Sequence, residues 1–273
     1  MKRSKINMVN ITIEMVKQLR KRTGAGMMTC KKALIEANGN IEIAIDYIRK
    51  QGETRSTKKL DSAACEGIIL IKMDGNYGTM IEINCETDFV SKNASFKTFA
   101  DSIITTAVRD RIQDIEILKS QFKNERLELM NAVGENINIR RISSIREKEN
   151  EISFYLHGTR IGVMVITSKG TNKQFGKHIA MHIAASKPEY VKPELIPIKV
   201  LEHERNIQKD LAIKSGKPHN ILEKIIEGRI RKYLDELTLV CQKFIFEPTK
   251  TVGQVLKENN TEVIKFIRFE VGE

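Results

Sequence analysis

The sequence contains no tryptophan and only five tyrosines, five prolines and four cysteines among its 273 residues. Without tryptophan and with few tyrosines, it lacks an obvious aromatic platform on which single-stranded nucleic acids could stack. Its cysteines are far apart and form no C-x-x-C pair, which argues against a zinc site and against a disulfide scaffold. Such a pattern suits a reducing compartment, so we expect a cytoplasmic protein.

Long apolar runs are also missing. No stretch approaches the roughly 18 consecutive apolar residues that a membrane-spanning helix needs, so we expect no membrane partner. Residues 1–10 carry lysine and arginine without an apolar segment behind them, which excludes a secretory signal of the usual kind. We interpret them as an extension, with Met8 as an alternative start to Met1.

Sequence signatures of catalysis are absent as well. The chain has no G-x-x-x-x-G-K-[ST], G-x-G-x-x-G or G-x-S-x-G motif, so it should not bind a nucleotide directly by those devices. His178 and His182 have the spacing of zincin ligands, but Ile179 stands where those enzymes have their general base. Packing or partner contact is the better interpretation. We therefore expect a binding protein, not an enzyme, with no cofactor and no metal.

Positive charge, in contrast, is abundant: 46 lysines and arginines against 35 acids give a net charge of +11. This balance is compatible with nucleic-acid binding. However, the basic residues are spread along the chain without a block of five or six, and the sequence is rich in isoleucine, lysine and asparagine. A biased codon composition would produce the same charge, so a nucleic-acid partner is not favoured.

Hydrophobic periodicity divides the chain into segments and predicts an α+β fold. Residues 11–52 read as a compact three-helix unit of the ubiquitin-associated type, with Ile13, Val16 and Leu19 facing inward. Its first turn, residues 23–28, includes Met27 and Met28, which either fill the small core or contact a partner. Residues 53–64 are polar and read as a linker.

Beyond the linker, a hairpin followed by a helix occurs twice, about 85 residues apart, which predicts two small antiparallel sheets backed by helices. We expect a first core subdomain over 65–142, with strand 136–142 and one long helix over 115–132 that ends at Gly134. A second subdomain covers 143–193 and is completed by 236–273, with strands at 244–246 and 266–271. Residues 194–235 read as an inserted antiparallel helical hairpin, or coiled coil.

One turn stands out, Thr87-Asp88-Phe89-Val90, which lies between an apolar strand and a helix with Phe96, Phe99 and Ile103 aligned. Nothing in such a turn requires an acid followed by a large aromatic residue. Asp88 could cap a helical turn, and Phe89 could fold back under the sheet. Alternatively, the pair projects outward and enters another protein.

Several motifs together resemble the family of bacterial elongation factor Ts. They cover nearly the whole chain in order: L-R-K-R-T-G-A-G-M-M (19–28), C-K-K-A-L (30–34), N-C-E-T-D-F-V (84–90), G-E-N-I-N-I-R-R (134–141), H-I-A-M-H-I-A-A-S-K-P (178–188), T-V-G-Q-V-L-K-E (251–258) and F-I-R-F-E-V-G (266–272). The resemblance implies a nucleotide-exchange factor for the GTPase elongation factor Tu. Many members continue with a further helix, whereas this chain stops at Glu273, which implies weaker binding.

The resemblance also implies roles for particular residues. Thr87, Asp88, Phe89 and Val90 would intrude near the Mg²⁺ and phosphate site of elongation factor Tu and promote release of GDP. Contacts with the same partner are further implied for Met27, Met28 and Lys31, and for Gly134 and His157. The alternative that remains is a basic RNA-binding protein without exchange activity.

Overall fold

The computed structural model describes residues 11–23, 25–48, 65–214 and 219–273. The predicted extension and linker lie outside these residues. The described chain divides into two compact units. One holds the residues up to Leu70 together with Ile81–Ile142 and Val271–Glu273, and the other holds Ile71–Met80 and Ser143–Glu270. Within the described ranges, none of the helices is both long enough and apolar enough to span a bilayer.

Three helices form the N-terminal part: α1 (Ile13–Thr23), α2 (Met27–Glu36) and a third that is helical over residues 41–48. Their apolar stripes meet in a small core, which includes Val16, Leu19, Cys30, Ala33, Leu34, Ala44 and Ile48. The prediction for Ile13 is wrong, because its side chain is 64% exposed. The turn also ends earlier than predicted, since α2 begins at Met27 and both methionines lie on its first turn.

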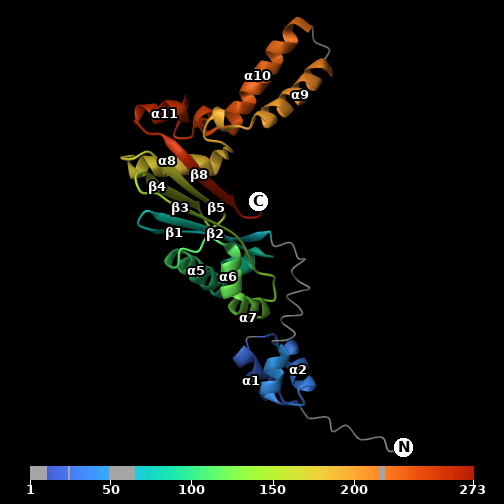
Figure 1. Ribbon diagram of the computed structural model, residues 1–273. Coiled ribbons are helices and arrows are strands. Elements are labelled where there is room, and N and C mark those ends of the chain that lie inside the picture. Colours follow the sequence, from blue (N-terminus) through green and yellow to red (C-terminus); the bar gives the residue numbers. More distant parts are fainter. Residues whose placement is uncertain (1–10, 24, 49–64, 215–218) are drawn as a thin grey trace, which may run out of the picture. The chain divides into compact units, whose positions relative to one another are not determined.

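The first sheet contains β1 (Glu66–Asp74), β2 (Tyr77–Cys85) and β3 (Asn138–Arg146), in the order β1-β2-β3 (Figure 1). The predicted hairpin is confirmed, and Gly75 has the positive φ of +57° that its tight turn requires. Gly67 allows a close approach of β1 to β2, because a Cβ atom there would lie 2.2 Å from the Ile83 carbonyl oxygen. The third strand starts two residues later than predicted and runs four residues further.

Four helices follow or flank this sheet: α4 (Asp88–Lys92), α5 (Ala94–Arg109), α6 (Ile115–Gln121) and α7 (Lys123–Val133). The prediction of one helix over 115–132 is wrong. Phe122 has φ −95° and ψ 15°, which ends α6 and begins α7, and its ring packs edge-on against Phe99 with centroids 6.1 Å apart. Burial of that ring in the core outweighs the helical periodicity. Gly134 ends α7 at φ +80°, as predicted.

A buried carboxylate joins β2, β3 and the C-terminal residues. Glu82 is fully buried, and its Oε1 accepts hydrogen bonds from Arg140 Nη1 at 3.0 Å and from Gly272 N at 3.1 Å. Its Oε2 accepts from Arg141 Nε at 2.5 Å. Two guanidinium groups therefore compensate the charge that the fold removes from water.

The second sheet consists of β4 (Glu151–His157), β5 (Ile161–Thr167) and β8 (Val263–Glu270), all antiparallel, in the order β4-β5-β8. Helix α8 (Lys173–Ser186) packs on β4 and β5 (Figure 1). The approach is close at Gly176, where a Cβ atom would lie 2.2 Å from Ser153 Oγ. The predicted final strand is confirmed as the partner of β5, although β8 starts three residues earlier than predicted.

Between α8 and β8 the chain forms η1 (Pro193–Leu195), α9 (Ile198–Lys214), α10 (His219–Leu237), η2 (Leu239–Cys241), β6 (Lys243–Phe244), β7 (Glu247–Thr251) and α11 (Val252–Glu258). Helices α9 and α10 contact each other and share an apolar cluster of Ala212, Leu222 and Ile226. The strand predicted over 244–246 is wrong in its bounds. Residues 245 and 246 instead form the turn between β6 and β7.

Candidate functional site

The Thr87–Val90 segment follows directly from the end of β2 at Cys85. Thr87 is the N-cap of α4, and Asn93 both ends α4 and caps α5 with a bond from Ser95 N to its Oδ1 at 2.8 Å. A five-residue helix would be unstable by itself. Its position therefore depends on contacts outside the helix and on the hairpin and the long helix that flank it.

Phe89 projects from this short helix into solvent. Its side chain is 82% exposed, whereas the next two residues, Val90 and Ser91, are only 7% and 8% exposed. Burying one face of α4 leaves the opposite face, with Phe89, directed outward. The interpretation that Phe89 folds under the sheet is therefore wrong for this structure. A phenylalanine this exposed buries almost none of its apolar surface, so its free state carries a hydrophobic group available to a partner.

Asp88 is half-exposed beside Phe89 and pairs with Lys92, whose Nζ lies 2.6 Å from Asp88 Oδ2. The hydrogen bond from Lys92 lowers the pKa of the Asp88 carboxyl group below its ordinary value, so the group is ionised at neutral pH. An ion pair at this exposure contributes little to stability. The interpretation of Asp88 as the helix cap is wrong, because the N-cap position belongs to Thr87.

The carboxylate of Glu135, which lies after α7 in the chain, is hydrogen-bonded to the residues that precede α4. Its Oε2 accepts hydrogen bonds from the backbone N–H groups of Glu86 at 3.1 Å and of Thr87 at 3.0 Å, and its Oε1 accepts from the Thr87 hydroxyl at 2.6 Å. In return, Glu86 Oε1 accepts from the backbone N–H of Asn136 at 2.7 Å. These four bonds, which we call the Glu86–Glu135 clamp, join two loops that lie about fifty residues apart.

Cys85 supports the same turn from the inside. Its Sγ donates to the Thr87 carbonyl oxygen at 3.2 Å. Burial, with the nearby negative charges of Glu135 and Glu66, raises the pKa of the Cys85 thiol to about 12. The thiol therefore stays protonated at neutral pH, acts as a hydrogen-bond donor and is not a nucleophile.

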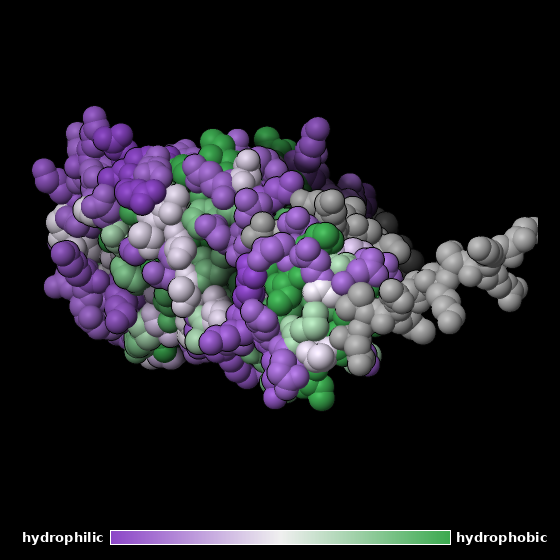
Figure 2. Space-filling view, turned by 90° about the horizontal axis from the view of Figure 1, so that it is seen from below, coloured by the Kyte–Doolittle hydropathy of each residue, from purple (hydrophilic) through white to green (hydrophobic). Residues whose placement is uncertain are grey.

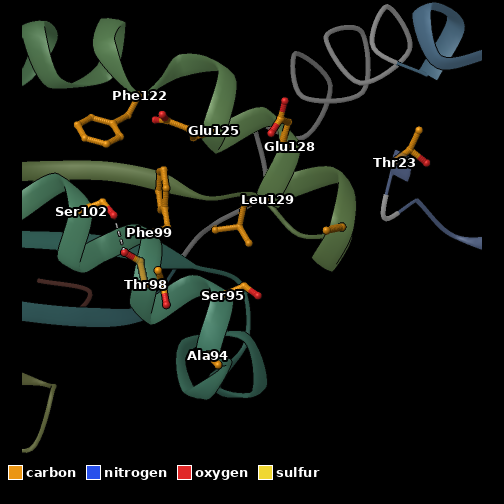
Figure 3. A pocket seen from close by; sticks show the side chains of 11 residues that line it. Thr23, Ala94, Ser95, Thr98, Phe99, Ser102, Phe122, Glu125, Glu128 and Leu129 are labelled. Carbon is orange, nitrogen blue, oxygen red and sulfur yellow. Dashed lines mark hydrogen bonds between the residues drawn. The ribbon is translucent and has the colours of Figure 1, made fainter. Parts of the chain in front are cut away.

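A shallow groove lies between α5 and α7 in the same unit (Figure 3). Its walls include Ala94, Ser95, Thr98, Phe99 and Ser102 from α5 and Glu125, Glu128 and Leu129 from α7. The hydrogen bond drawn there runs from Ser102 Oγ to the Thr98 carbonyl oxygen, at 3.0 Å, inside α5. These α5 and α7 walls carry hydroxyl groups and two carboxylates but no histidine or lysine base, so they offer no activated nucleophile.

The remaining predicted residues occupy separate elements. Met27 and Met28 are 43% and 66% exposed on α2, and Lys31 is exposed one turn further along, so the methionines are surface residues and do not fill the core. Gly134 directly precedes Glu135, whose carboxylate is hydrogen-bonded to Thr87, so Gly134 lies near the Thr87–Val90 segment. His157 is exposed at the end of β4, where its Nδ1 lies 3.1 Å from the Tyr155 hydroxyl.

Exposed apolar side chains are therefore distributed over several elements. On the face drawn in Figure 2, hydrophobic side chains form small patches between hydrophilic ones. Two further exposed residues, Ile245 and Phe246, belong to the β6–β7 turn and are 40% and 48% exposed. The strand predicted over 244–246 gave no indication that these two residues lie in a turn.

A family comparison relates these features to known proteins. A family model described as Elongation factor TS matches residues 86–273. Elongation factor Ts from Yersinia pestis (strain Pestoides F) is 54% identical over 268 residues, which cover 97% of this chain and 93% of that protein. The proteins of the same name from Yersinia pseudotuberculosis serotype O:1b (strain IP 31758) and serotype O:3 (strain YPIII) match to the same extent. The chain belongs to the elongation factor Ts family.

Both histidines of the His178–His182 pair contact the β6–β7 turn in this member of the elongation factor Ts family. His178 stacks on Phe246 with ring centroids 4.5 Å apart, while His182 is fully buried. The His182 Nδ1 accepts from Ile245 N at 3.3 Å, so its Nε2 carries the proton and donates to Gln242 Oε1 at 3.0 Å. In the part of the chain that the structure describes, no three histidines, cysteines or acids are grouped as metal ligands.

Sequence reasoning about the elongation factor Ts segment missed Glu135. The glycine at 134 indicated the end of a helix, but it gave no reason to connect the next residue with Thr87, 48 positions earlier. An acid directly after a helix-ending glycine is a weak signal, because most such acids face solvent. Only the tertiary structure brings its carboxylate to the start of α4.

Proposed function

We propose that the chain releases GDP from elongation factor Tu by inserting Phe89 and Asp88 beside the Mg²⁺ and phosphate site of that GTPase. As a member of the elongation factor Ts family, the chain is a guanine-nucleotide exchange factor for elongation factor Tu and not an enzyme. The single observation that carries the proposed mechanism is the 82% exposure of Phe89 next to two buried residues. An aromatic side chain in this state is ready to leave water for a partner.

The energetics agree with Phe89 acting as a wedge, that is, as an apolar side chain that enters the GTPase and keeps one of its helices displaced. A thousandfold acceleration of nucleotide release requires about 4 kcal/mol off the barrier. Burial of one phenylalanine side chain supplies roughly 1.5–3 kcal/mol, which could hold a displaced helix of the GTPase. By thermodynamic linkage, the factor and GDP then weaken each other's binding by the same ratio. The ionised carboxylate of Asp88 would perturb the Mg²⁺ ion and its water ligands electrostatically.

Other surfaces would supply affinity. We assign Met27, Met28 and Lys31 to a contact with the GTPase domain, together with Thr87 and Gly134, and His157 to a contact with another domain of elongation factor Tu. Val90 is buried, so we assign it to the support of Phe89 and not to direct contact. The exposure of the two methionines supports the first contact, since flexible thioether side chains adapt to a partner surface. We further propose that α9 and α10 form an inserted antiparallel coiled coil, and that the subdomain boundaries are those given by the sequence periodicity.

The test is release of labelled GDP from elongation factor Tu, followed by stopped flow with and without the chain. Phe89→Ala should lower the accelerated rate by about tenfold or more, since about 1.4 kcal/mol corresponds to a factor of ten. The thermal unfolding midpoint should stay unchanged, because the side chain is exposed. Ile117→Ala is the matched control, since Ile117 is another exposed apolar residue of the same unit.

An unchanged rate for Phe89→Ala would exclude the wedge mechanism. The RNA-binding alternative makes a different prediction: a strongly salt-dependent shift of RNA in a gel, with no effect of the chain on GDP release. The two readouts are independent, so each hypothesis can fail separately.

A further inference from the structure

We propose that Glu135 is a positioning residue for nucleotide exchange: through the Glu86–Glu135 clamp, its carboxylate fixes the start of α4 and thereby the direction of Phe89. This inference rests on the proposed function of Phe89. Glu135 itself need not touch the partner. Its role is to hold the backbone from which the exposed phenylalanine projects.

One carboxylate, that of Glu135, accepts hydrogen bonds from three donors. Two consecutive backbone N–H groups, of Glu86 and Thr87, point at Oε2, and the Thr87 hydroxyl points at Oε1. All three donors belong to the two residues that precede α4. Hydrogen bonds to an ionised acceptor are stronger than those between neutral groups, so this end of α4 is held more firmly than an ordinary turn.

The side chain of Thr87 does not cap α4. As the N-cap of α4 it would normally accept a bond from the first turn of its own helix, but it makes no such side-chain bond. Its hydroxyl donates to Glu135 instead. A helix of five residues without a side-chain cap depends on contacts outside itself for its position.

The clamp also contains a hydrogen bond in the opposite direction, in which Glu86 is the acceptor. Glu86 accepts from the Asn136 backbone N–H at 2.7 Å, so the loop before β3 is held to the end of β2 by both glutamates. On the other side of Phe89, Val90 and Ser91 are buried. The exposed ring is thus flanked by two fixed points, and its backbone has little freedom to turn away.

A fixed backbone matters for a wedge because ordering a loop during binding costs free energy that the partner contact would otherwise retain. Loosening the clamp should therefore reduce the rate at which bound GDP is expelled more than it reduces assembly with elongation factor Tu. A residue with only a structural role would instead lower the amount of folded protein and leave the saturated rate intact.

The principal experiment measures GDP release as a function of factor concentration for Glu135→Ala, Glu135→Gln and Glu149→Ala. Glu149 is an exposed acid of another loop and serves as the control. We expect Glu135→Ala to lower the saturating release rate about tenfold, as a misplaced reacting group would. Glu135→Gln keeps an oxygen acceptor and the side-chain length, so it should stay within about threefold of the parent. Glu149→Ala should equal the parent.

A double-mutant cycle decides whether Glu135 acts through Phe89. In a Phe89→Ala background, Glu135→Ala should have almost no further effect on the saturating rate, because the side chain being positioned is gone. If Glu135→Ala slows exchange equally with and without Phe89, the inference is wrong. If Phe89→Ala alone changes nothing, the wedge proposal fails instead, so the two failures are distinguishable.

A spectroscopic readout covers the case in which Glu135→Ala unfolds. The chain contains no tryptophan, so Phe89→Trp introduces a single tryptophan on α4, which can be excited selectively in the presence of the five tyrosines. Time-resolved anisotropy of this tryptophan should show additional fast motion when Thr87→Val removes the hydroxyl donor to Glu135. Equal anisotropy in the presence and absence of that hydroxyl, at equal thermal stability, would overturn the positioning role.

Discussion

Two stretches of the chain start alike, with a β-hairpin followed by a helix that an asparagine caps, and differ in what lies between. In the first, Asn93 caps α5 after the β1–β2 hairpin; in the second, Asn172 caps α8 after the β4–β5 hairpin. In the first stretch, residues 86–92 separate the end of β2 from Asn93, and Asp88–Lys92 among them form α4. In the second stretch, only residues 168–171 separate the end of β5 from Asn172, and they form a loop. The extra residues are the ones that carry Phe89.

The segment that contains α4 is thus an addition to a repeated scaffold. Counting from each asparagine, Phe96 corresponds to Phe175 and Ile103 to His182. The second strands of the two hairpins, β2 and β5, can be compared from their ends. Glu82 lies three residues before the end of β2, and Met164 lies three residues before the end of β5. Both are fully buried. The same backbone pattern is thus stabilised by a buried ionic cluster in one stretch and by an apolar residue in the other.

The largest expected effect is on the free energy of unfolding, and it differs between the corresponding residues Phe96 and Phe175. Phe96 is fully buried, so Phe96→Ala should lower the free energy of unfolding by about 3–5 kcal/mol. Phe175 is only partly buried, so Phe175→Ala should cost about half as much. Urea denaturation measures both. A larger cost at Phe175 would mean that the two helices are not packed in equivalent ways.

The second largest effect is expected at the buried ionic cluster of Glu82, Arg140 and Arg141. Glu82→Met gives β2 the residue that β5 has at the corresponding position, but it leaves Arg140 and Arg141 without their buried acceptor. We expect a loss of about 3 kcal/mol in the free energy of unfolding. Replacing both arginines by methionine in the same chain should recover much of it. No recovery would show that hydrogen bonds to Glu82 from other groups, such as Gly272 N, dominate.

A smaller effect belongs to the shared caps. Asn93→Ala and Asn172→Ala should each cost about 1 kcal/mol of stability. Asn172 accepts two backbone bonds, from Gln174 and Phe175, and Asn93 accepts one, so Asn172→Ala should be the more costly. Only Asn93→Ala should also slow GDP release, because Asn93 ends α4 as well. Aspartate at either position should restore the cap.

The effect that is smallest at neutral pH is a dependence of stability on pH from His182, which Ile103 cannot share. Burial lowers the pKa of His182 below its ordinary 6.5, so the unfolded chain binds a proton that the folded chain does not. Stability should therefore fall as the pH drops below about 6.5, by at most about 1.4 kcal/mol per pH unit. His182→Gln should flatten the pH dependence of the unfolding midpoint between pH 7 and 5. An unchanged slope in that variant would assign the titration to other groups.

Local patterns alone predicted a large part of this molecule. Glycine-containing turns and β-branched runs identified both hairpins, and the 3.6-residue period identified α5 and α8. The same reasoning failed at Phe122, because the spacing of apolar residues continues unchanged through the break between α6 and α7. It failed again at Ile245 and Phe246, which have the composition of a strand but form a turn. Periodicity reports which residues can share a face and not whether a neighbour occupies that face.

The sequence by itself determined the α+β class, the family and the identity of the Thr87–Val90 segment, because these depend on local patterns and motifs. The tertiary structure decided that Phe89 is exposed, since burial of Val90 and Ser91 directs it outward. It also decided that Glu135 is hydrogen-bonded to Glu86 and Thr87, because a hydrogen bond across 48 residues depends on where β2 and the loop before β3 come together. Contacts of this kind leave no periodic trace in the chain, and only folding brings their atoms within bonding distance.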